Sequence, residues 1–305
     1  MKHLLLALTM AISIISAHAQ ENITLVYSWT AGDTAANFYR ALANEANKLQ
    51  NKYNFIVDYK PGAGGTVAAN ATLANANNAL WLNSSAAFIR PNLYPNDSHD
   101  ITAFRTLMPM CMVSFVAISS KYRSWNEVPK NAKLTIGMTG LGTTTHLVSI
   151  QIAKNFPNMI VIPFKSTSEA LVNVLSGAID FSIGVHSDSE QYTINTQPRQ
   201  IYWLGQTGRQ SIKATELLVN QGFSQDLGNM NAPHQIFAAR KMSEDRFREL
   251  RGVLVEAARA QSVISASLAA NCIPGSQLPD IQLDTWFSSQ QNQWKRLTQG
   301  LVLAK

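Results

Sequence analysis

Two glycine-rich turns contain the residues with the clearest chemical use in this sequence. The first, residues 61–66, reads Pro-Gly-Ala-Gly-Gly-Thr and follows a β-forming run at residues 55–59. Glycines at a strand-to-helix turn let the backbone approach a ligand closely, because they adopt positive φ at little cost. The first amides of the following helix point into such a turn, where the helix dipole favours an anion. Alone, the pattern also fits an ordinary tight turn, so its weight comes from the second turn.

The second turn, residues 137–146, combines glycines with three consecutive threonines and His146. Amides and hydroxyls at one helix start supply several hydrogen-bond donors, as capture of a carboxylate requires. A threonine N-cap on an ordinary helix explains the same residues equally well. Because the helix dipole disfavours a cation in the first turn, we expect His146 to be neutral. It is then either a hydrogen-bonding group of the turn or a residue satisfied by packing or solvent.

Strands and helices alternate around both turns. The hydrophobic pattern predicts the elements of the first alternation as follows: strand 23–29, helix 35–50, strand 55–59, helix 66–76 and strand 79–83. A second alternation begins near Lys133, with these elements: strand 134–138, a helix after the second turn, strand 160–164, a helix that ends at Gly177, and strand 178–183. One long amphipathic helix is expected at 243–262.

This order of elements predicts two α/β lobes. A β-α-β-α-β sequence implies a parallel sheet with helices on both faces, and ligands bind such sheets at the carboxyl ends of the strands. Both glycine-rich turns follow strands, so they belong to these ends. No low-complexity linker separates the two alternations, which suggests a cleft between the lobes.

The N-terminus and the charge bound the class of function. Lys2, an apolar run at 4–16 and Ala17-His18-Ala19 predict a signal peptide over residues 1–19, and hence an exported, periplasmic protein. No later stretch has the roughly 20 apolar residues of a membrane-spanning helix, so we expect no membrane insertion. The chain has 25 basic and 19 acidic side chains, scattered without a basic run, which argues against nucleic-acid binding.

The two cysteines, Cys111 and Cys272, are expected to be free thiols. Export makes a disulfide permissible, but two cysteines far apart in the sequence form no recognisable framework. The sequence therefore favours free thiols over a disulfide, and leaves the redox state open.

Three segments together resemble one family. Residues 57–66 look like the V-x-N-R-P-G-A-G-G segment of the tripartite tricarboxylate transporter substrate receptors, also called Bug or TctC-like proteins. Residues 137–146 are similar to that family's G-S-x-G-x-G-T-x-x-H, and residues 163–171, with Gly177 and Asp180, resemble its P-Y-K-G-x-x-P-A-L … G-x-x-D. The motifs have the family's order and spacing, and the resemblance covers essentially the whole mature chain.

The resemblance implies a class II periplasmic-binding-protein fold. Each lobe would hold a mixed, mainly parallel sheet flanked by helices, with the ligand cleft between the lobes. We expect lobe 1 to comprise residues 20–118 and 238–305, and lobe 2 residues 119–237. The implied protein is a monomeric solute receptor, not an enzyme. It would need no cofactor and would deliver a small carboxylate to a membrane permease of the tripartite tricarboxylate type.

The resemblance also nominates ligand-binding residues. In such receptors the first strand-to-helix loop and the Pro-Gly-Ala-Gly-Gly loop bind a carboxylate through backbone amides and ordered water, and the second lobe reads the rest of the ligand. The matching positions here are Thr30, Ala31, Gly32, Asp33, Gly64, Gly65, Thr66, Ser84, Ser85, Gly142, Thr143, Thr144, His146, Lys165 and Ser166. Trp29 is added because it borders the first of these loops.

The sequence departs from the family where ligands are discriminated. Aligning Arg40 with the family's arginine puts Ala36 at the family's aspartate and leaves a new carboxylate at Asp33. A second family aspartate, a few residues after Asp180, falls on Gly184. Asp33 either caps the next helix, or it repels an anionic ligand and selects one with a cationic or hydroxyl group. The identity of the ligand is therefore open.

Two other functions stay open at this point. An exported hydrolase or transferase could use Ser84 or Ser85 with His146, although no nucleophile-elbow pattern surrounds the serines. A receptor scaffold repurposed for sensing is compatible with the lost aspartate at Ala36. A zinc site is not expected, because the four histidines of the mature chain show no metal-ligand spacing: His99, His146, His186 and His234.

Overall fold

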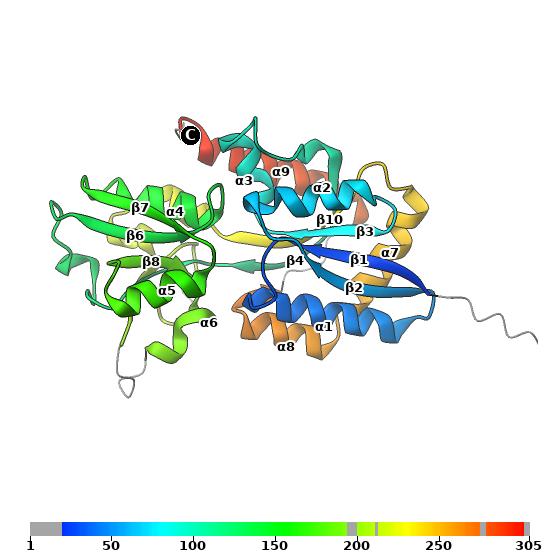
Figure 1. The fold of residues 1–305 in the computed structure, drawn as a ribbon, viewed down its shortest axis with the longest axis horizontal. Helices are drawn as coiled ribbons and strands as arrows, with labels where there is room; N and C mark the ends of the chain where they lie inside the picture. The colour runs from blue at the N-terminus through cyan, green and yellow to red at the C-terminus, as the bar shows by residue number, and fades with distance from the viewer. Residues whose placement is uncertain (1–19, 194–199, 211–212, 275–278, 302–305) are drawn as a thin grey trace, which may run out of the picture.

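The computed structural model describes residues 20–193, 200–210, 213–274 and 279–301. Residues 1–19 lie outside these ranges, so the signal peptide stays a prediction. The described chain forms two mixed sheets, each flanked by helices (Figure 1), which confirms the predicted α/β fold class. We call the half built on the six-stranded sheet lobe 1 and the half built on the five-stranded sheet lobe 2.

The lobe 1 sheet has the strand order β11-β4-β10-β3-β1-β2. Its strands are β1 (Glu21–Tyr27), β2 (Tyr53–Tyr59), β3 (Ala79–Asn83), β4 (Phe104–Val113), β10 (Ala232–Ala239) and β11 (Cys272–Pro274). β1 lies parallel to both β2 and β3, as the β-α-β-α-β pattern predicts, whereas β10 lies antiparallel to β3 and β4. The turns after β1, β2 and β3 therefore open at one edge of the sheet.

Helices cover both faces of this sheet (Figure 1). One face packs on α1 (Thr34–Leu49), α7 (Glu244–Ala257) and α8 (Gln261–Ala269), and the other on α2 (Thr66–Ala74), α3 (Ala86–Leu93) and α9 (Asp280–Thr298). Buried aromatic side chains fill both interfaces, with Phe38 on the first face and Trp81 on the second, each 0% exposed. Burying such large apolar surfaces is the main driving force for this packing.

The expected single helix at 243–262 is wrong in one respect. The chain forms α7 and α8 with a break at residues 258–260, where Ala260 has extended backbone angles (φ −64°, ψ 139°). The inward face is as predicted, because Phe247, Leu250 and Leu254 are buried. The break lets both helices pack against α1. No glycine or proline marks it, so the local sequence contains no signal for it.

Lobe 2 has the strand order β7-β6-β8-β5-β9. Its elements are β5 (Val116–Ser119), β6 (Leu134–Thr139), α4 (Thr144–Ala153), β7 (Met159–Phe164), α5 (Thr167–Ser176), β8 (Phe181–Gly184), α6 (His186–Ser189) and β9 (Tyr202–Gln206). Gly177 closes α5 in the left-handed conformation (φ 79°), which confirms the predicted C-cap. β6 lies parallel to β7 and β8.

The chain passes between the sheets twice. It leaves lobe 1 after β4 and returns with β10, so one crossing falls at residues 114–115 and the other lies between β9 and β10. The expected boundaries at 118/119 and 237/238 lie close to these crossings but stay a prediction, because sheet membership alone does not define a domain.

The prediction of free thiols is wrong. Cys111 and Cys272 form a disulfide with a Cα–Cα distance of 5.3 Å. The short strand β11 pairs antiparallel with β4, with Pro274 opposite Cys111 and Cys272 opposite Val113, and this pairing brings the two cysteines together. The sequence conceals the contact because the paired strands are 161 residues apart.

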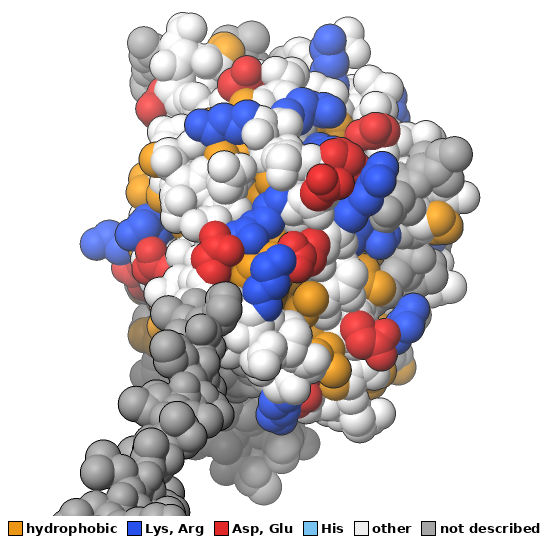
Figure 2. Space-filling model, turned by 90° about the vertical axis from the view of Figure 1, so that its right-hand side faces the viewer, with side chains coloured by type: hydrophobic (Ala, Val, Ile, Leu, Met, Phe, Trp, Pro, Cys, Tyr) orange, Lys and Arg blue, Asp and Glu red, His pale blue; other side chains and the backbone are white. Residues whose placement is uncertain are grey.

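The surface carries charges of both signs. On the end of lobe 1 that faces away from lobe 2, acidic and basic side chains lie beside one another (Figure 2). Ion pairs between exposed groups occur elsewhere along the described chain, for example between Arg259 and Glu256 at 2.8 Å. This face therefore has no extended field of one sign, in keeping with the scattered charge of the sequence.

Candidate functional site

The cleft between the lobes contains two adjoining cavities. The outer compartment, about 410 Å³, is lined by the 61–64 turn and Thr30 of lobe 1 and by residues 139–140 and 164–166 of lobe 2. The inner compartment, about 90 Å³, lies between the start of α1 and residues of β10, α4 and α6. Trp29, Asp33, Thr139 and Thr143 line both, so they form the shared wall.

The 61–64 turn presents unused amides to the outer compartment. Gly62, Ala63 and Gly64 all line it, and none of their N–H groups has an acceptor among the described residues. Two backbone hydrogen bonds close the turn, from Gly65 N–H to the Gly62 carbonyl at 3.0 Å and from Thr66 N–H to the Ala63 carbonyl. α2 begins directly afterwards, so its dipole adds to the attraction for an anion. The turn can therefore bind a carboxylate through its backbone.

Two glycines of this turn are required by close contacts. Gly65 has φ 99°, and a Cβ there would lie 2.1 Å from Asn83 Nδ2. Gly64 has φ 60°, and a Cβ there would lie 2.9 Å from Arg90 Cδ. Side chains are disfavoured at these positions by both the backbone angle and the space. The turn is thus held in place by residues far away in the sequence.

The 140–146 turn uses most of its polar side chains internally. Thr143 Oγ1 caps α4 by accepting from the His146 amide at 3.3 Å and donates to the Thr139 carbonyl at 2.7 Å. Thr145 Oγ1 accepts from the Thr139 amide at 3.1 Å. The N-cap interpretation is therefore confirmed for Thr143. The hydroxyls of both threonines stabilise the turn more than they offer donors to the cleft.

His146 is a neutral part of this turn. Its Nδ1 accepts from the Gly142 amide at 3.1 Å, and the side chain is buried. Burial lowers the pKa of His146 to about 4, so the ring is uncharged at neutral pH. Of the two expectations for this residue, the hydrogen-bonding group of the turn is the observed one, and its bond lies within the turn.

Arg90 joins the two turns. This side chain of α3 is 6% exposed, and its guanidinium donates to the Leu141 carbonyl at 3.2 Å and pairs with Asp97 at 3.0 Å. It also lies against both glycines that approach it, because a Cβ on Gly142 would meet Arg90 Cβ at 3.2 Å. The sequence analysis did not single out Arg90. The feature of the sequence that could have identified Arg90 is its positive charge directly after the apolar residues 86–89.

The inner compartment is acidic. Asp33 caps α1 by accepting from the Ala35 amide at 2.8 Å, and it also accepts from the Tyr27 hydroxyl at 2.9 Å. From lobe 2, Asp188 accepts from Thr34 Oγ1 at 3.0 Å, a contact between the lobes. Burial, and to a smaller degree the charge of Asp33, raises the pKa of Asp188 to about 6. Burial also raises the pKa of Asp33.

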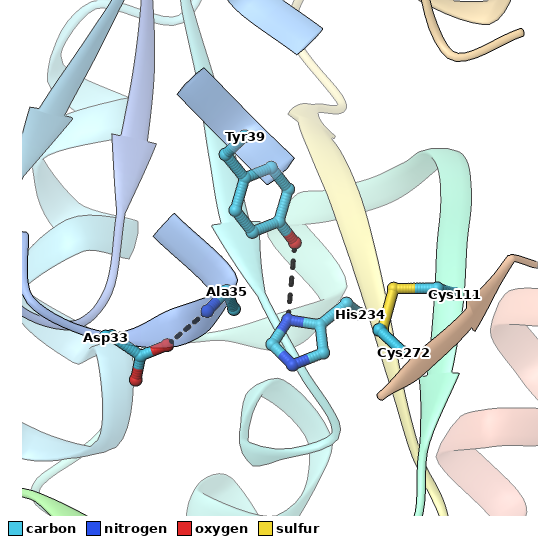
Figure 3. Close-up of a disulfide and its surroundings, with 6 residues drawn as sticks. All are labelled: Asp33, Ala35, Tyr39, Cys111, His234 and Cys272. Atoms are coloured by element: carbon cyan, nitrogen blue, oxygen red, sulfur yellow. Dashed lines mark hydrogen bonds between the residues drawn. A yellow bond between two sulfur atoms is a disulfide. The ribbon is translucent and has the colours of Figure 1, made fainter. Parts of the chain in front are cut away.

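Aromatic rings and His234 complete the inner wall. Figure 3 shows the His234 ring between the start of α1 and the disulfide, with Tyr39 and Nδ1 of His234 in hydrogen-bond contact at 3.5 Å. Trp29 and Phe38 lie near the same ring, with centroids 6.4 and 5.5 Å away. Burial lowers the pKa of His234 to about 4, so it is neutral as well. The sequence analysis missed Asp188 and His234, because neither lies in a motif that the family segments cover.

The predicted site residues divide into two groups. Ten line a compartment or the adjoining hollow of about 120 Å³: Trp29, Thr30, Gly32, Asp33, Gly64, Ser84, Thr143, Thr144, Lys165 and Ser166. Six do not line these cavities: Ala31, Gly65, Thr66, Ser85, Gly142 and His146.

Several of the second group are occupied elsewhere. Thr66 Oγ1 is bonded to His99 Nδ1 at 3.1 Å, within lobe 1, and Ser85 Oγ is bonded to Thr144 Oγ1 across the lobes. Gly65 packs against Asn83 and Gly142 packs against Arg90, and neither glycine lines these cavities. Neither serine is hydrogen-bonded to His146 among the described residues. The arrangement therefore lacks the contact between a nucleophile and a base that a serine hydrolase needs.

Two further kinds of feature were sought among the described residues, a metal-binding group of side chains and a membrane-spanning helix. Within those residues, no group of three or more histidine, cysteine, aspartate or glutamate side chains could hold a metal ion. None of the helices described there is long and apolar enough to cross a membrane.

Comparisons with known proteins concern the family and the fold. Residues 38–303 match the model of the tripartite tricarboxylate transporter family receptor. A search of curated protein sequences finds no significant match.

Solved structures with a similar fold include the periplasmic binding protein BugD. Its TM-score is 0.77 at 17% identity, and the match covers 92% of this chain and 97% of BugD. MatC from Rhodopseudomonas palustris, solved with bound malate, has a TM-score of 0.75 at 13% identity over 92% of this chain and 99% of its own. A protein from R. palustris, solved with adipate, has a TM-score of 0.75 at 14% identity over 91% and 96% of the two chains. At these identities the likenesses show the fold.

Proposed function

This chain belongs to the tripartite tricarboxylate transporter family of receptors, and we propose that its outer compartment binds the carboxylate of a small solute. Its role is that of a solute-binding receptor and not of an enzyme. The observation that carries the proposal is the set of three unused amides at Gly62, Ala63 and Gly64, which line a cavity of about 410 Å³. Backbone amides ahead of a helix are a general way to bind a carboxylate.

Lobe 2 supplies the opposite side of the outer compartment. Lys165 lines it and brings a positive charge, and Ser166 brings a hydroxyl. Because a charge-assisted hydrogen bond is about twice as strong as a neutral one, Lys165 strengthens the hold on an anion. The malate and adipate bound to two proteins of the same fold support a solute of this class. Contacts from both lobes to one anion would favour closure of the cleft.

The transport role follows from the family. We propose that the protein acts in the periplasm as a monomer and delivers its solute to a membrane permease of the tripartite tricarboxylate type. A role in sensing would use the same cleft with a different partner. Purification of cross-linked complexes from the host's membranes distinguishes the two. Recovery of a permease supports delivery, and recovery of a sensor kinase instead contradicts it.

The carboxylate assignment is tested with two glycine variants. Gly64→Ala puts a methyl group at the turn that lines the outer compartment, against Arg90. Gly177→Ala is the matched control, because Gly177 also has positive φ (79°) but has no atom within 4 Å of its would-be Cβ. Both variants bear similar backbone strain. Only Gly64→Ala should weaken binding of the solute that co-purifies from the host, as identified by native mass spectrometry and measured by calorimetry. Equal binding by both variants contradicts the assignment.

A further inference from the structure

We propose that the solute carries a primary ammonium group in addition to its carboxylate, and that this ammonium binds in the inner compartment between Asp33 and Asp188. The inference rests on the proposed function, in which the outer compartment takes the carboxylate. It goes further because it names a second charged group of the solute and the residues that select it.

Each of the two aspartates keeps one carboxylate oxygen available. Asp33 Oδ1 accepts from both Tyr27 and Ala35, and Asp188 Oδ1 accepts from Thr34. Neither Oδ2 atom has a donor among the described residues. Both side chains line the inner compartment and the adjoining hollow. Two acceptors from opposite lobes therefore face the same space.

The lining of this compartment contains no cation to balance them. It includes two aspartates and the neutral His234, and neither lysine nor arginine. Partly buried carboxylates without a partner are unfavourable in a folded protein. By contrast, the outer compartment contains Lys165. The cleft thus has one compartment suited to an anion and one suited to a cation.

Ser84 is an independent indication that a polar group binds here. Its side chain lines the inner compartment and is 8% exposed. No described residue forms a hydrogen bond with its hydroxyl. The oxygen is accessible from the compartment, so it can form a hydrogen bond with a polar group of a solute bound beside the two aspartates.

The aromatic side chains fit the same occupant. Tyr27, Trp29 and Phe38 line the inner compartment next to the aspartates. The faces of such rings attract an ammonium group within about 6 Å. A carboxylate in this position would instead meet two carboxylates. The inner compartment therefore discriminates against a second acidic group.

The size of the cavity limits what enters it. At about 90 Å³ it is smaller than the cavity of about 150 Å³ that holds benzene in an engineered protein. An ammonium group with one or two attached carbons fits this space. The rest of the solute, with its carboxylate, would occupy the larger outer compartment across the shared wall of Trp29 and Asp33.

The positions of the two aspartates also link the charge of the bound solute to closure of the cleft between the lobes. Asp33 belongs to lobe 1 and Asp188 to lobe 2, so their repulsion opposes approach of the lobes. A cation between them reverses this effect. We expect an amino acid to favour the closed form more than its deaminated analogue does.

Calorimetry with matched pairs of probes tests the inference. The pairs are L-aspartate and succinate, β-alanine and propionate, and 4-aminobutyrate and butyrate, and each pair differs by one ammonium group. On the wild-type protein the amino member of at least one pair should bind at least about 10-fold more tightly, the scale of one charged hydrogen bond. Asp188→Asn should remove most of this preference. Asp226→Asn changes a half-exposed aspartate between β9 and β10 that pairs with Arg296 and lines neither compartment, so it should keep the preference.

A second variant covers the case in which Asp188→Asn does not fold. Asp33→Asn keeps the helix cap, since asparagine caps as well as aspartate, and it too should reduce the preference. Tighter or equal binding of the deaminated members overturns the inference and leaves the proposed function intact. Preference that persists in both variants also overturns it. Binding of neither series contradicts the proposed function and the inference together.

Discussion

The two glycine-rich turns lie on opposite sides of one cleft, yet they use their hydrogen-bonding groups in different ways. In lobe 1, the 61–65 turn leaves the amides of residues 62–64 without an acceptor among the described residues, and it packs against distant residues, Asn83 and Arg90. In lobe 2, the 140–146 turn is held by its own Thr143 and His146. Side chains that bond the nearby backbone consume the groups that a ligand would need. Glycine turns without such side chains are therefore the better anion sites.

The largest expected effect comes from loss of the disulfide. This disulfide joins two strands of lobe 1, so its removal should affect the two lobes differently. Replacing Cys111 and Cys272 by serine frees a loop of 161 residues in the unfolded state and should cost about 2–5 kcal/mol. Hydrogen exchange should speed up in β4, β10 and β11 and stay unchanged in β6 and β8. Equal acceleration in both lobes would show that the lobes are not independently supported.

The next effect compares the two turns directly. Gly65→Ala forces a Cβ to 2.1 Å from Asn83 Nδ2 at φ 99°, so overpacking and backbone strain together should cost about 2–4 kcal/mol. Gly140→Ala, with φ 74° and its nearest contact at 3.3 Å, should cost about 1 kcal/mol. Denaturant unfolding measures both. A larger loss for Gly140→Ala would contradict the view that close contacts with distant residues constrain the lobe 1 turn more than the lobe 2 turn.

A smaller effect concerns the internal support of the lobe 2 turn. His146→Ala leaves the buried Gly142 amide without its acceptor and should cost about 1–3 kcal/mol. Lys165→Ala should leave stability nearly unchanged, because Lys165 is exposed, but should weaken binding of the carboxylate solute. Unfolding and calorimetry on both variants separate these roles. Strong loss of binding with intact stability in His146→Ala would give this histidine a ligand role instead.

The smallest expected effect is a pH dependence from Asp188. Its raised pKa, about 6, means that the folded protein binds this proton more tightly than the unfolded chain does. This group therefore contributes stability below its unfolded pKa and loses it as pH rises through about 6. Asp188→Asn should raise the Tm of the ligand-free protein at pH 7.5, and the difference should shrink towards pH 4.

The wild-type protein and the Asp188→Asn variant contain the same four buried histidines. Burial lowers the pKa of His99, His146, His186 and His234 to about 4, so acid destabilises both proteins alike between about pH 6.5 and 4. The difference in Tm cancels this common loss. A difference that grows as pH falls would contradict the raised pKa of Asp188.

Periodic segments made much of the fold predictable from the sequence. The strand at 79–83 matches β3, and the strand at 134–138 matches β6 within one residue, because alternating or continuous apolar runs are bounded by turn residues. The break between α7 and α8 was not predictable, since it depends on packing against α1 and not on a local residue. The disulfide was missed because β11 has only three residues and pairs with a distant strand.

The part of the site that is formed by backbone conformation was predictable from the sequence. The Pro-Gly-Ala-Gly-Gly turn lines the cleft, and its sequence marks it because the backbone there has positive φ, which glycine adopts at little cost. Asp33 was identified as a helix cap or a selective charge, and it caps the helix while it lines the cleft. Asp188 was not found, because it lies in a four-residue helix without periodicity, and its proximity to Asp33 exists only in the folded chain.

The most direct test is a crystal structure of the protein with the solute that co-purifies from its host. We expect the solute's carboxylate within hydrogen-bond distance, about 2.7–3.2 Å, of the amides at residues 62–64. We also expect Lys165 on the opposite side of that carboxylate. A solute bound only by the 140–146 turn, with the 62–64 amides left to solvent, would contradict the account.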